Sequence, residues 1–329
     1  MGGKAHKDAS VQRLSTSKWT SLSTHIKSLF ARNDCIKRIE ALRVDPEKSS
    51  HGDLDLITLI DAQDRETLND ICKQIRLTNK IDHSYLYDYL NEKHQVDLQV
   101  LTDSETFDLA YFCQSYGDLG IILSKCVRAM GMSLSSVTGL CHREKMPISG
   151  DYKSYTITKK PQKICEYLGL DFEQWRAGFT SRDAIFDWLQ PVTPTFQMRP
   201  GDETRYANRE MFQQFLKLAR TSCIDHLPTS NIRTTVLQRL ELDGAYARVR
   251  DNVEKDIAKE MYHSKFKEVF NACIVNTHLK EEFGIELQGK QLGTFLNVIR
   301  AMLPLNHIPT KEEVKQQIIH QYKCMYSIS

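Results

Sequence analysis

The chain has 329 residues, of which 41% are hydrophobic and 26% charged, and its formal net charge is +2. These values are typical of globular domains and exclude wholesale disorder, and the length is sufficient for two or three domains. No apolar run approaches the roughly 18 residues that a membrane-spanning helix needs, and the N-terminal segment lacks the apolar stretch of a secretory signal. We therefore expect an intracellular, cytoplasmic protein with no membrane partner, associated with the nucleoid if the source is bacterial.

The nine cysteines are spread along the chain and never form a C-x-x-C pair. A structural zinc site needs closely spaced ligand pairs, and a secreted disulfide scaffold needs a dense cysteine framework. We expect reduced cysteines that act as small core side chains, and neither a metal ion nor another cofactor.

The N-terminal part of the chain is predicted to be helical. Residues 1–16 are small, polar and basic, and they are expected to form a flexible basic tail. Apolar residues from Trp19 to Phe30 then follow one helical stripe, and a second short helix is expected from Asp34. The polar segment 45–52, which contains a proline and a glycine, is typical of a linker.

Further short helices are expected in the rest of this N-terminal helical region, which extends over residues 17–104. One of them would be capped by Asp64 and another by Asp82. The carboxylates that could in principle hold a metal ion are Asp53, Asp55, Asp61 and Asp64. Because no liganding spacing recurs among them, we favour a solvated helix face over a metal site.

The central segment, residues 105–189, carries a pattern of two helices joined by a tight turn. The first helix is predicted to end at Gly131, since glycine readily adopts the left-handed conformation that closes a helix. Ser133 can cap the next helix, whose Val137 and Leu140 would pack against the first. This pattern is typical of a DNA-binding motif that places its second helix in the major groove.

The residues that spell this motif are Val127, Gly131, Met132, Ser133, Val137 and Leu140. A basic loop ending at Pro147 follows, and then a Leu168–Gly169 pair before an acidic helix start. Over residues 105–178 this order resembles the helix-turn-helix of the Cro and phage-repressor (XRE) family. The sequence departs from the family at Val127, where alanine is commoner, and by an insert from Gly150 to Lys160.

The resemblance implies that this domain binds double-stranded DNA, as a homodimer or within a larger protein complex. The side chains expected to face bases or phosphates from the second helix and its flanks are Ser133, Ser135, Ser136, Thr138, His142 and Arg143. The DNA backbone would be bound by Lys145, Lys153, Lys159 and Lys160. Between residues 121 and 165, eight basic residues outnumber two acidic ones, which favours phosphate binding.

The C-terminal part is predicted to be a separate helical domain. The segment 190–204 contains three prolines and a glycine and is predicted to be an interdomain linker. Residues 205–329 follow as a helical domain whose last helix opens with the capping-box pair Thr310 and Glu313. Apart from an alternating run at 152–157, the chain shows little β pattern. The predicted fold class is therefore all-α, a multidomain helical protein with a central helix-turn-helix domain.

The common phosphate-binding, dinucleotide-binding, zinc-protease and serine-hydrolase signatures do not occur in the sequence, so we expect no enzymatic activity and no catalytic residue. The predicted function is DNA binding, in a transcription regulator or a subunit of a phage or mobile-element nucleoprotein complex. An alternative is a helical scaffold or virion-type structural protein that mediates protein–protein interaction without specific DNA binding. RNA binding is a weaker alternative, because the Gly-aromatic motifs of sheet-based RNA modules are absent.

Overall fold

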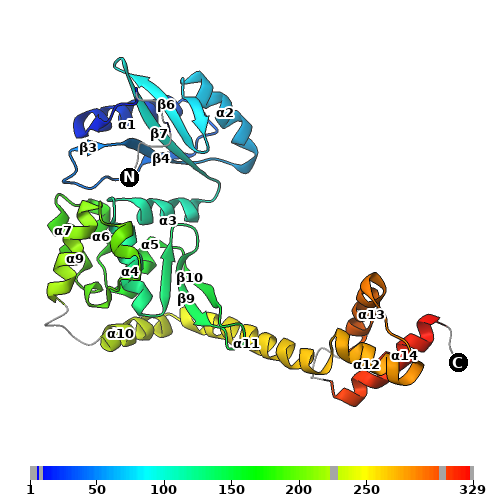
Figure 1. Ribbon diagram of the computed structural model, residues 1–329. Helices are drawn as coiled ribbons and strands as arrows, with labels where there is room; N and C mark the ends of the chain where they lie inside the picture. The colour runs from blue at the N-terminus through cyan, green and yellow to red at the C-terminus, as the bar shows by residue number, and fades with distance from the viewer. Residues whose placement is uncertain (1–5, 7–9, 223–228, 304–308, 327–329) are drawn as a thin grey trace. The chain divides into compact units, whose positions relative to one another are not determined.

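The computed structural model describes residue 6 and residues 10–222, 229–303 and 309–326 (Figure 1). The chain divides into two compact units, one formed by residues 1–143 with 154–249 and the other by residues 144–153 with 250–329. The predicted linker 190–204 lies within the first unit. There Thr193 and Thr195 are buried, and the Thr195 hydroxyl donates a hydrogen bond of 2.9 Å to the Cys126 carbonyl. This proline-rich segment therefore packs on a helix of its own unit.

The first unit begins with a five-stranded mixed sheet. Its strands, in spatial order, are β2 (Arg38–Ala41), β4 (Asp53–Leu59), β7 (Glu92–Leu101), β6 (Ser84–Tyr89) and β5 (Thr78–Ile81). The central strands β4 and β7 are parallel, and the other neighbours pair antiparallel. Helices α1 (Thr16–Phe30) and α2 (Arg65–Gln74) pack on one face, where Leu54, Leu56, Val96 and Leu98 are buried in the same core.

The all-α prediction is wrong, because the described residues contain a five-stranded, a three-stranded and a two-stranded sheet. The predicted helix after Asp34 is strand β2, and the predicted helix after Asp82 is strand β6. Apolar side chains three or four residues apart suggested helices there. In β6, however, Tyr85 and Tyr87 follow a period of two and join the core that α1 and α2 cover.

The segments predicted as tail and linker also contribute to this layer. Residues 1–5 and 7–9 of the predicted tail lie outside the described residues. Leu14 and Ser15 form β1 (Leu14–Ser15), which pairs antiparallel with β3 (Ser50–His51), and Leu14 is fully buried. The segment 45–52 therefore belongs to the fold, as the connection that ends in β3 and leads directly into β4.

The rest of the first unit is mainly helical and surrounds a second core, which lies below the sheet in Figure 1. Its elements are α3 (Ser104–Gln114), α4 (Leu119–Ala129), β8 (Met132–Ser135), β9 (Gly139–Lys145), β10 (Tyr152–Thr158), α5 (Pro161–Leu168), α6 (Phe172–Ala177), α7 (Arg182–Leu189), α8 (Asp202–Arg205), α9 (Glu210–Ser222) and α10 (Thr229–Leu242). Two short 3-10 turns are η1 (Ala62–Asp64) and η2 (Thr193–Thr195). Helix α3 covers the second face of the large sheet, where Phe107 packs on Ile57 and Leu59.

The predicted helix-turn-helix is a helix followed by a β-hairpin. Helix α4 ends as predicted before Gly131, which has φ +77°. Residues 132–145 then form β8 and β9, so the predicted second helix is wrong. Met132 and Leu134 point inward along β8 with a period of two, whereas Val137, expected to be buried, lies in the turn with 60% of its surface exposed.

The hairpin depends on Gly139, which has φ +74° and lies against the next strand. A Cβ at this position would come within 2.2 Å of the Thr158 carbonyl oxygen. We expect Gly139→Ala to lower the free energy of unfolding by about 2–4 kcal/mol, through backbone strain and overpacking together. Gly201→Ala is the control, because Gly201 also has a positive φ but open space around its Cα, and it should cost about 1–2 kcal/mol. Urea unfolding measures the free energy of unfolding of both variants. Equal losses of this free energy in Gly139→Ala and Gly201→Ala would contradict the close packing at Gly139.

Residues 250–329, which make up most of the second unit, are mainly helical where the structure describes them. Helix α11 (Ala245–Val269) enters it from the first unit, and α12 (Ala272–Phe283), α13 (Gly289–Met302) and α14 (Lys311–Tyr326) follow. The predicted capping box is confirmed, since Glu313 accepts from the Thr310 amide and the Thr310 hydroxyl accepts from the Glu313 amide.

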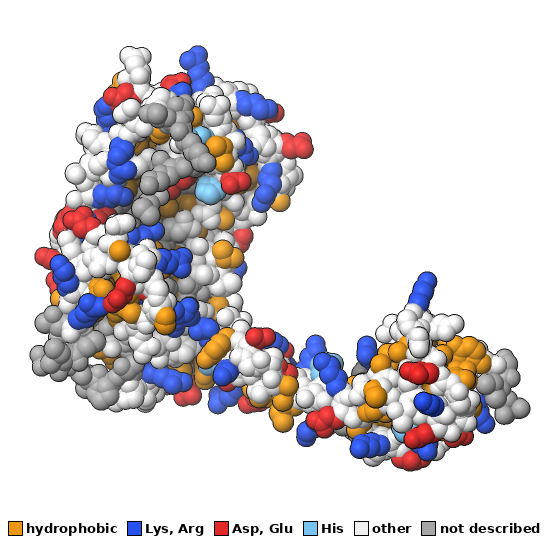
Figure 2. Space-filling view, in the orientation of Figure 1, with side chains coloured by type: hydrophobic (Ala, Val, Ile, Leu, Met, Phe, Trp, Pro, Cys, Tyr) orange, Lys and Arg blue, Asp and Glu red, His pale blue; other side chains and the backbone are white. Residues whose placement is uncertain are grey.

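Hydrophobic side chains, including Met261 and Met302, are exposed on this unit (Figure 2). Within the described ranges no helix has both the length and the apolar character needed to cross a bilayer.

Candidate metal and phosphate site

Three carboxylates gather on the face of the large sheet that α1 and α2 do not cover. The side chains of Asp53, Asp55 and Asp97 can each offer an oxygen within 4.8 Å of the others. Asp53 and Asp55 lie on β4, and Asp97 lies on the adjacent parallel strand β7. Such a group of hard oxygen ligands is of the kind that holds Mg²⁺ or Mn²⁺.

Strand register explains why these residues meet. Asp55 and Asp97 are direct partners in the parallel ladder between β4 and β7. Asp53 lies two residues before Asp55, and side chains two apart on a strand point to the same face. The alternation Asp53-Leu54-Asp55-Leu56 therefore directs the leucines into the core under α1 and α2 and the carboxylates to the other face.

The Asp97 carboxylate is held in place by neighbours on the same face. One of its oxygens accepts hydrogen bonds from the Ser84 hydroxyl at 2.6 Å and from the Gln95 amide at 2.8 Å. Ser84 and Gln95 are each 2% exposed. Carboxylates that bind metal ions are commonly oriented by such buried hydrogen bonds. The cluster thus has one ligand that is already oriented by its surroundings.

The charges of the cluster repel one another. Asp55 faces a cavity, but protein atoms surround its carboxyl group on the other sides. The resulting desolvation, and then the charges of Asp53 and Asp97, raise the pKa of Asp55 to about 7. The nearby Lys48 opposes the shift only in part. Above about pH 7 the three carboxylates would all be charged, and a bound cation would neutralise part of that charge.

This electrostatic cost makes stability depend on pH. An unfolded aspartate titrates near 3.8, so between about pH 4 and pH 7 the native state holds a proton at Asp55 that the unfolded chain has lost. Below this window Asp55→Asn should resemble the wild type, because Asp55 is then neutral in both states. Above about pH 7 in the absence of divalent ions, we expect the variant to be more stable by about 1–2 kcal/mol, a value discounted for solvent in the cavity. Urea unfolding at several pH values measures this difference, and a constant difference would contradict the assignment.

A cavity of about 610 Å³ opens above Asp53 and Asp55, within the first unit. Its basic lining residues are Arg13, Arg43, Lys48, Arg182 and Arg209. Trp19 and His51 also line it, with ring centroids 5.8 Å apart. The volume lies within the range of roughly 300–1,000 Å³ that small-molecule and cofactor sites have.

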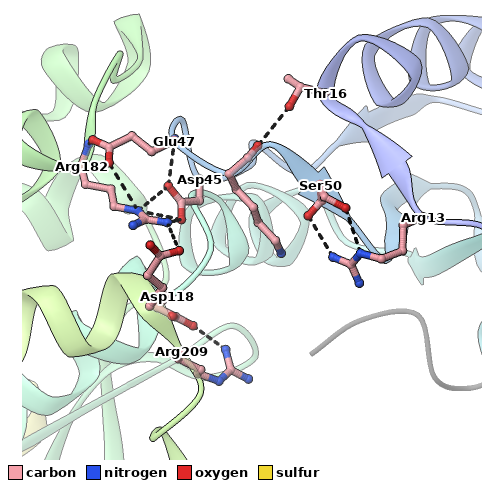
Figure 3. A network of polar contacts seen from close by, with 10 residues as sticks. Arg13, Thr16, Asp45, Glu47, Ser50, Asp118, Arg182 and Arg209 are labelled. Atoms are coloured by element: carbon pink, nitrogen blue, oxygen red, sulfur yellow. Dashed lines mark hydrogen bonds and ion pairs between the residues drawn. The ribbon is translucent and has the colours of Figure 1, made fainter.

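The cations nearest the β1–β3 pair create a positive potential beside the carboxylates. Arg13 donates to the Ser50 hydroxyl and to the Ser50 carbonyl, both at 2.9 Å (Figure 3). Lys48 is exposed, and no ion-pair partner for its ammonium occurs among the described residues. Burial, and then the charges of Lys48 and Arg13, lower the pKa of His51. An anion bound here would be stabilised by both basic groups.

A buried arginine fixes the connection that carries Lys48 and Ser50. The Arg182 guanidinium binds the buried Asp45 carboxylate at 2.8–3.0 Å and the Glu210 carboxylate at 3.1 Å (Figure 3). Its backbone amide also donates to Glu47 at 2.8 Å. Hydrogen bonding to Asp45 raises the pKa of Arg182 further above its usual value, so the guanidinium stays charged. Helices α7 and α9 thereby hold the 45–52 segment in place.

Arg43 attaches the start of the same segment to the helical part of the unit. Its guanidinium donates to the hydroxyls of Tyr111 and Tyr116, at 3.1 and 2.5 Å, and to the carbonyls of Trp175 and Arg176, at 2.7 and 2.8 Å. The guanidinium carbon also lies 5.2 Å from the centroid of the Trp175 ring. One wall of the cavity is therefore built by residues that are far apart in the sequence.

The residues predicted to bind DNA lie elsewhere, on the hairpin and its flanks. Ser133 and Ser135 are on β8, Ser136 and Thr138 are in the turn, and His142, Arg143 and Lys145 are on β9. The remaining predicted lysines are Lys153 on β10 and Lys159 and Lys160 just before α5. Since no second helix presents them, the predicted docking in the major groove loses its structural basis.

Several of these side chains have partners within the protein. The Ser135 hydroxyl lies 2.7 Å from the Thr138 hydroxyl and accepts the Thr138 amide. His142 is 9% exposed and its ring packs edge-on against Tyr246. Lys153 forms an ion pair of 3.3 Å with Asp256. These contacts give Ser135, Thr138 and His142 a structural role in the hairpin. DNA binding by the lysines stays a prediction.

From the sequence, Asp53 and Asp55 are two of four carboxylates that we considered as metal ligands and predicted to lie on a solvated helix face. They lie on a strand, and their partner is the distant Asp97 rather than Asp61 or Asp64. The signal that could have revealed the site was the alternation of carboxylates and leucines in residues 53–56, together with the alternation of apolar and polar residues in Val96-Asp97-Leu98-Gln99-Val100. Both features indicate strands with one polar face.

No protein-family model matches the chain, and no curated protein matches it. The function must therefore be inferred from the geometry and chemistry of the site.

Proposed function

We propose that this protein is a divalent-cation-dependent nucleotidyl transferase that uses a nucleoside triphosphate as its donor. This replaces our sequence-based expectation of a DNA-binding protein without enzymatic activity. The observation that carries the proposal is the cluster of three carboxylates, two of which, Asp53 and Asp55, line one cavity together with five basic side chains.

A metal ion bound to phosphate oxygens would satisfy both sides. Mg²⁺ is usually held by one or two carboxylates together with substrate phosphates. Asp53, Asp55 and Asp97 would supply these carboxylates, with Asp97 oriented by its bonds to Ser84 and Gln95. Metal ions in such a site polarise the phosphoryl group and stabilise both the attacking and the leaving oxygens.

The basic residues favour a triphosphate over a single phosphate. Arg13 and Lys48 line the cavity from the β1–β3 side, and Arg209, which forms an ion pair with Asp118, lines it from the start of α9 (Figure 3). Such cations compensate charge that develops on a leaving group during phosphoryl transfer. A highly charged leaving group that lies among them fits pyrophosphate, which makes the transferred group a nucleotidyl group.

The full chain tests the proposal when it is incubated with Mg²⁺ or Mn²⁺ and an equimolar mixture of ATP, GTP, CTP and UTP. We expect release of pyrophosphate that depends on the divalent ion and stops on chelation. Label at the α-phosphorus should remain in the nucleotidyl product. Release of orthophosphate alone would assign the site to cleavage at the γ-phosphorus and overturn the proposal.

Binding provides a second readout that does not require turnover. We expect Mn²⁺ and the triphosphates together to raise Tm by about 5–10 °C at concentrations near 100 times Kd, where binding stabilises the fold by about 2.7 kcal/mol. The metal ion and the triphosphates should act cooperatively, because phosphate oxygens complete the coordination of the ion. If the wild type shows no Tm shift and releases no pyrophosphate, the proposed function is wrong.

A further inference from the structure

Gln95 is a buried glutamine beside the carboxylate cluster, and its side-chain oxygen has no partner. The residue is 2% exposed, and its Oε1 makes no hydrogen bond in the part of the chain that the structure describes. A buried acceptor without a partner costs free energy, because it has lost its hydrogen bonds to water. Folded proteins keep few such atoms, and a bound ion is one of the explanations for them. The Gln95 oxygen is therefore a candidate ligand atom.

Strand register places this amide on the same face as the carboxylates. Gln95 is the direct partner of Asp53 in the parallel ladder between β4 and β7, as Asp97 is of Asp55. Gln95 and Asp97 are two residues apart on β7, so their side chains point to the same face. The Gln95 Nε2 donates to the Asp97 Oδ1 at 2.8 Å. The amide group thus touches the cluster directly.

The bond to Asp97 also decides which atom of the amide is the unpartnered one. With the amide reversed, its oxygen would face an Asp97 oxygen, and two acceptors would meet without a proton between them. The bond uses the amide nitrogen and Oδ1 of Asp97, and the Ser84 hydroxyl donates to the same Oδ1. The second Asp97 oxygen takes no part in these bonds, so one ion can bind it together with the Gln95 oxygen.

We propose that the Gln95 amide oxygen and the three clustered carboxylates bind one hard divalent cation, and that they do so before any triphosphate arrives. Amide carbonyl oxygens bind such cations alongside carboxylates. Because the amide is uncharged, it adds an oxygen to the coordination shell without adding to the repulsion among the carboxylates. In a shell of about six to eight oxygens, four protein ligands leave positions for water or phosphate oxygens. This inference rests on the metal site of the proposed function but not on the transfer reaction.

The test measures Mn²⁺ binding to the full chain without nucleotide, from the electron paramagnetic resonance signal of the free ion. We expect the wild type to bind Mn²⁺, and Gln95→Met to raise the Kd about 100-fold, because the change removes a ligand and a bond that orients Asp97. Gln99→Met is the matched control. Gln99 lies on the same strand and face, but its side-chain oxygen already accepts from the Gln114 amide at 2.9 Å, so this variant should bind Mn²⁺ as the wild type does.

A second measurement separates a ligand from a side chain that only orients Asp97. Tb³⁺ prefers the same hard oxygen ligands, and its luminescence lifetimes in H₂O and D₂O give the number of water molecules bound to the ion. At saturating Tb³⁺, Gln95→Met should gain about one bound water in place of the amide oxygen. Ser84→Ala loses only a bond to Asp97 and should gain none. An unchanged number of waters in Gln95→Met would show that Gln95 does not touch the ion.

Urea unfolding in the presence of EDTA checks that the variant folds. Gln95→Met removes the unpartnered acceptor together with the donor to Asp97, so the midpoint should stay close to that of the wild type. If Gln95→Met does not fold, Gln95→Asn provides the same two metal measurements, because its shorter side chain withdraws the oxygen from the ion.

The outcomes separate this inference from the proposed function. Mn²⁺ binding to the wild type only in the presence of a triphosphate would overturn the inference and leave the proposed function standing. Equal Kd values for Mn²⁺ in Gln95→Met and Gln99→Met would also overturn the inference alone. Mn²⁺ binding that depends on Gln95, in a protein that releases no pyrophosphate from any triphosphate, would support the inference and remove the transfer reaction.

Discussion

Replacing Asp55 or Asp97 with asparagine is expected to reduce divalent-ion-dependent pyrophosphate release at least about 100-fold, because each change removes a charged ligand from the metal ions that would carry the reaction. The Tm shift caused by Mn²⁺ should disappear in the same variants. Asparagine has nearly the same shape as aspartate, and in the absence of metal it relieves repulsion within the cluster. A loss of activity should therefore not be accompanied by a loss of folding, which urea unfolding measures directly.

Two further variants make this test specific. Ser84→Ala keeps all three carboxylates but removes a hydrogen bond that orients Asp97, so metal affinity should fall about 10-fold. Asp61→Asn makes the same chemical change at a partly exposed aspartate that pairs with Lys37 and is not part of the cluster. Full activity in Asp55→Asn, or an equal loss in Asp61→Asn, would remove the carboxylate cluster from the proposed function.

Replacing the buried Arg182 with methionine is expected to destabilise the first unit by about 3–5 kcal/mol. Its side chain is 4% exposed and its partner Asp45 is 7% exposed, so the change leaves a buried carboxylate without its cation. Methionine preserves most of the volume, and the lost ion pair is then the main cause of the change. The same variant should weaken triphosphate binding, because the 45–52 segment that carries Lys48 loses the guanidinium bonds to Asp45 and keeps only the backbone bond from residue 182 to Glu47.

The control for this prediction is Arg176→Met, at an exposed arginine that pairs with Glu173. Exposed ion pairs contribute about 0–1 kcal/mol, so this change should have little effect on unfolding by urea. Combining Arg182→Met with Asp45→Leu should recover much of the lost stability, since both buried charges are then absent. A loss for Arg182→Met no larger than that for Arg176→Met would show that the buried pair does not stabilise the segment.

Parts of the fold follow from local sequence signals. Five features depend only on residues within one turn or one strand of each other. They are the first long helix, the positive φ of Gly131, the alternating strand at 152–158, the end of α5 at Gly169 and the Thr310 capping box. The large sheet does not, because its strands are short and their apolar residues fit a helix as well as a strand over five or six positions. Strand pairing over long sequence separations decides between the two.

The amino-acid sequence by itself determined the helical C-terminal part and the positions of several helix ends, because capping and helical periodicity act between residues a few positions apart. Only the tertiary structure decided that residues 53–55 lie on a strand beside Asp97, and that Arg182 holds the segment that carries Lys48. These are contacts between residues separated by dozens of positions. They arise from strand register and from the burial of an ion pair, which no local pattern encodes.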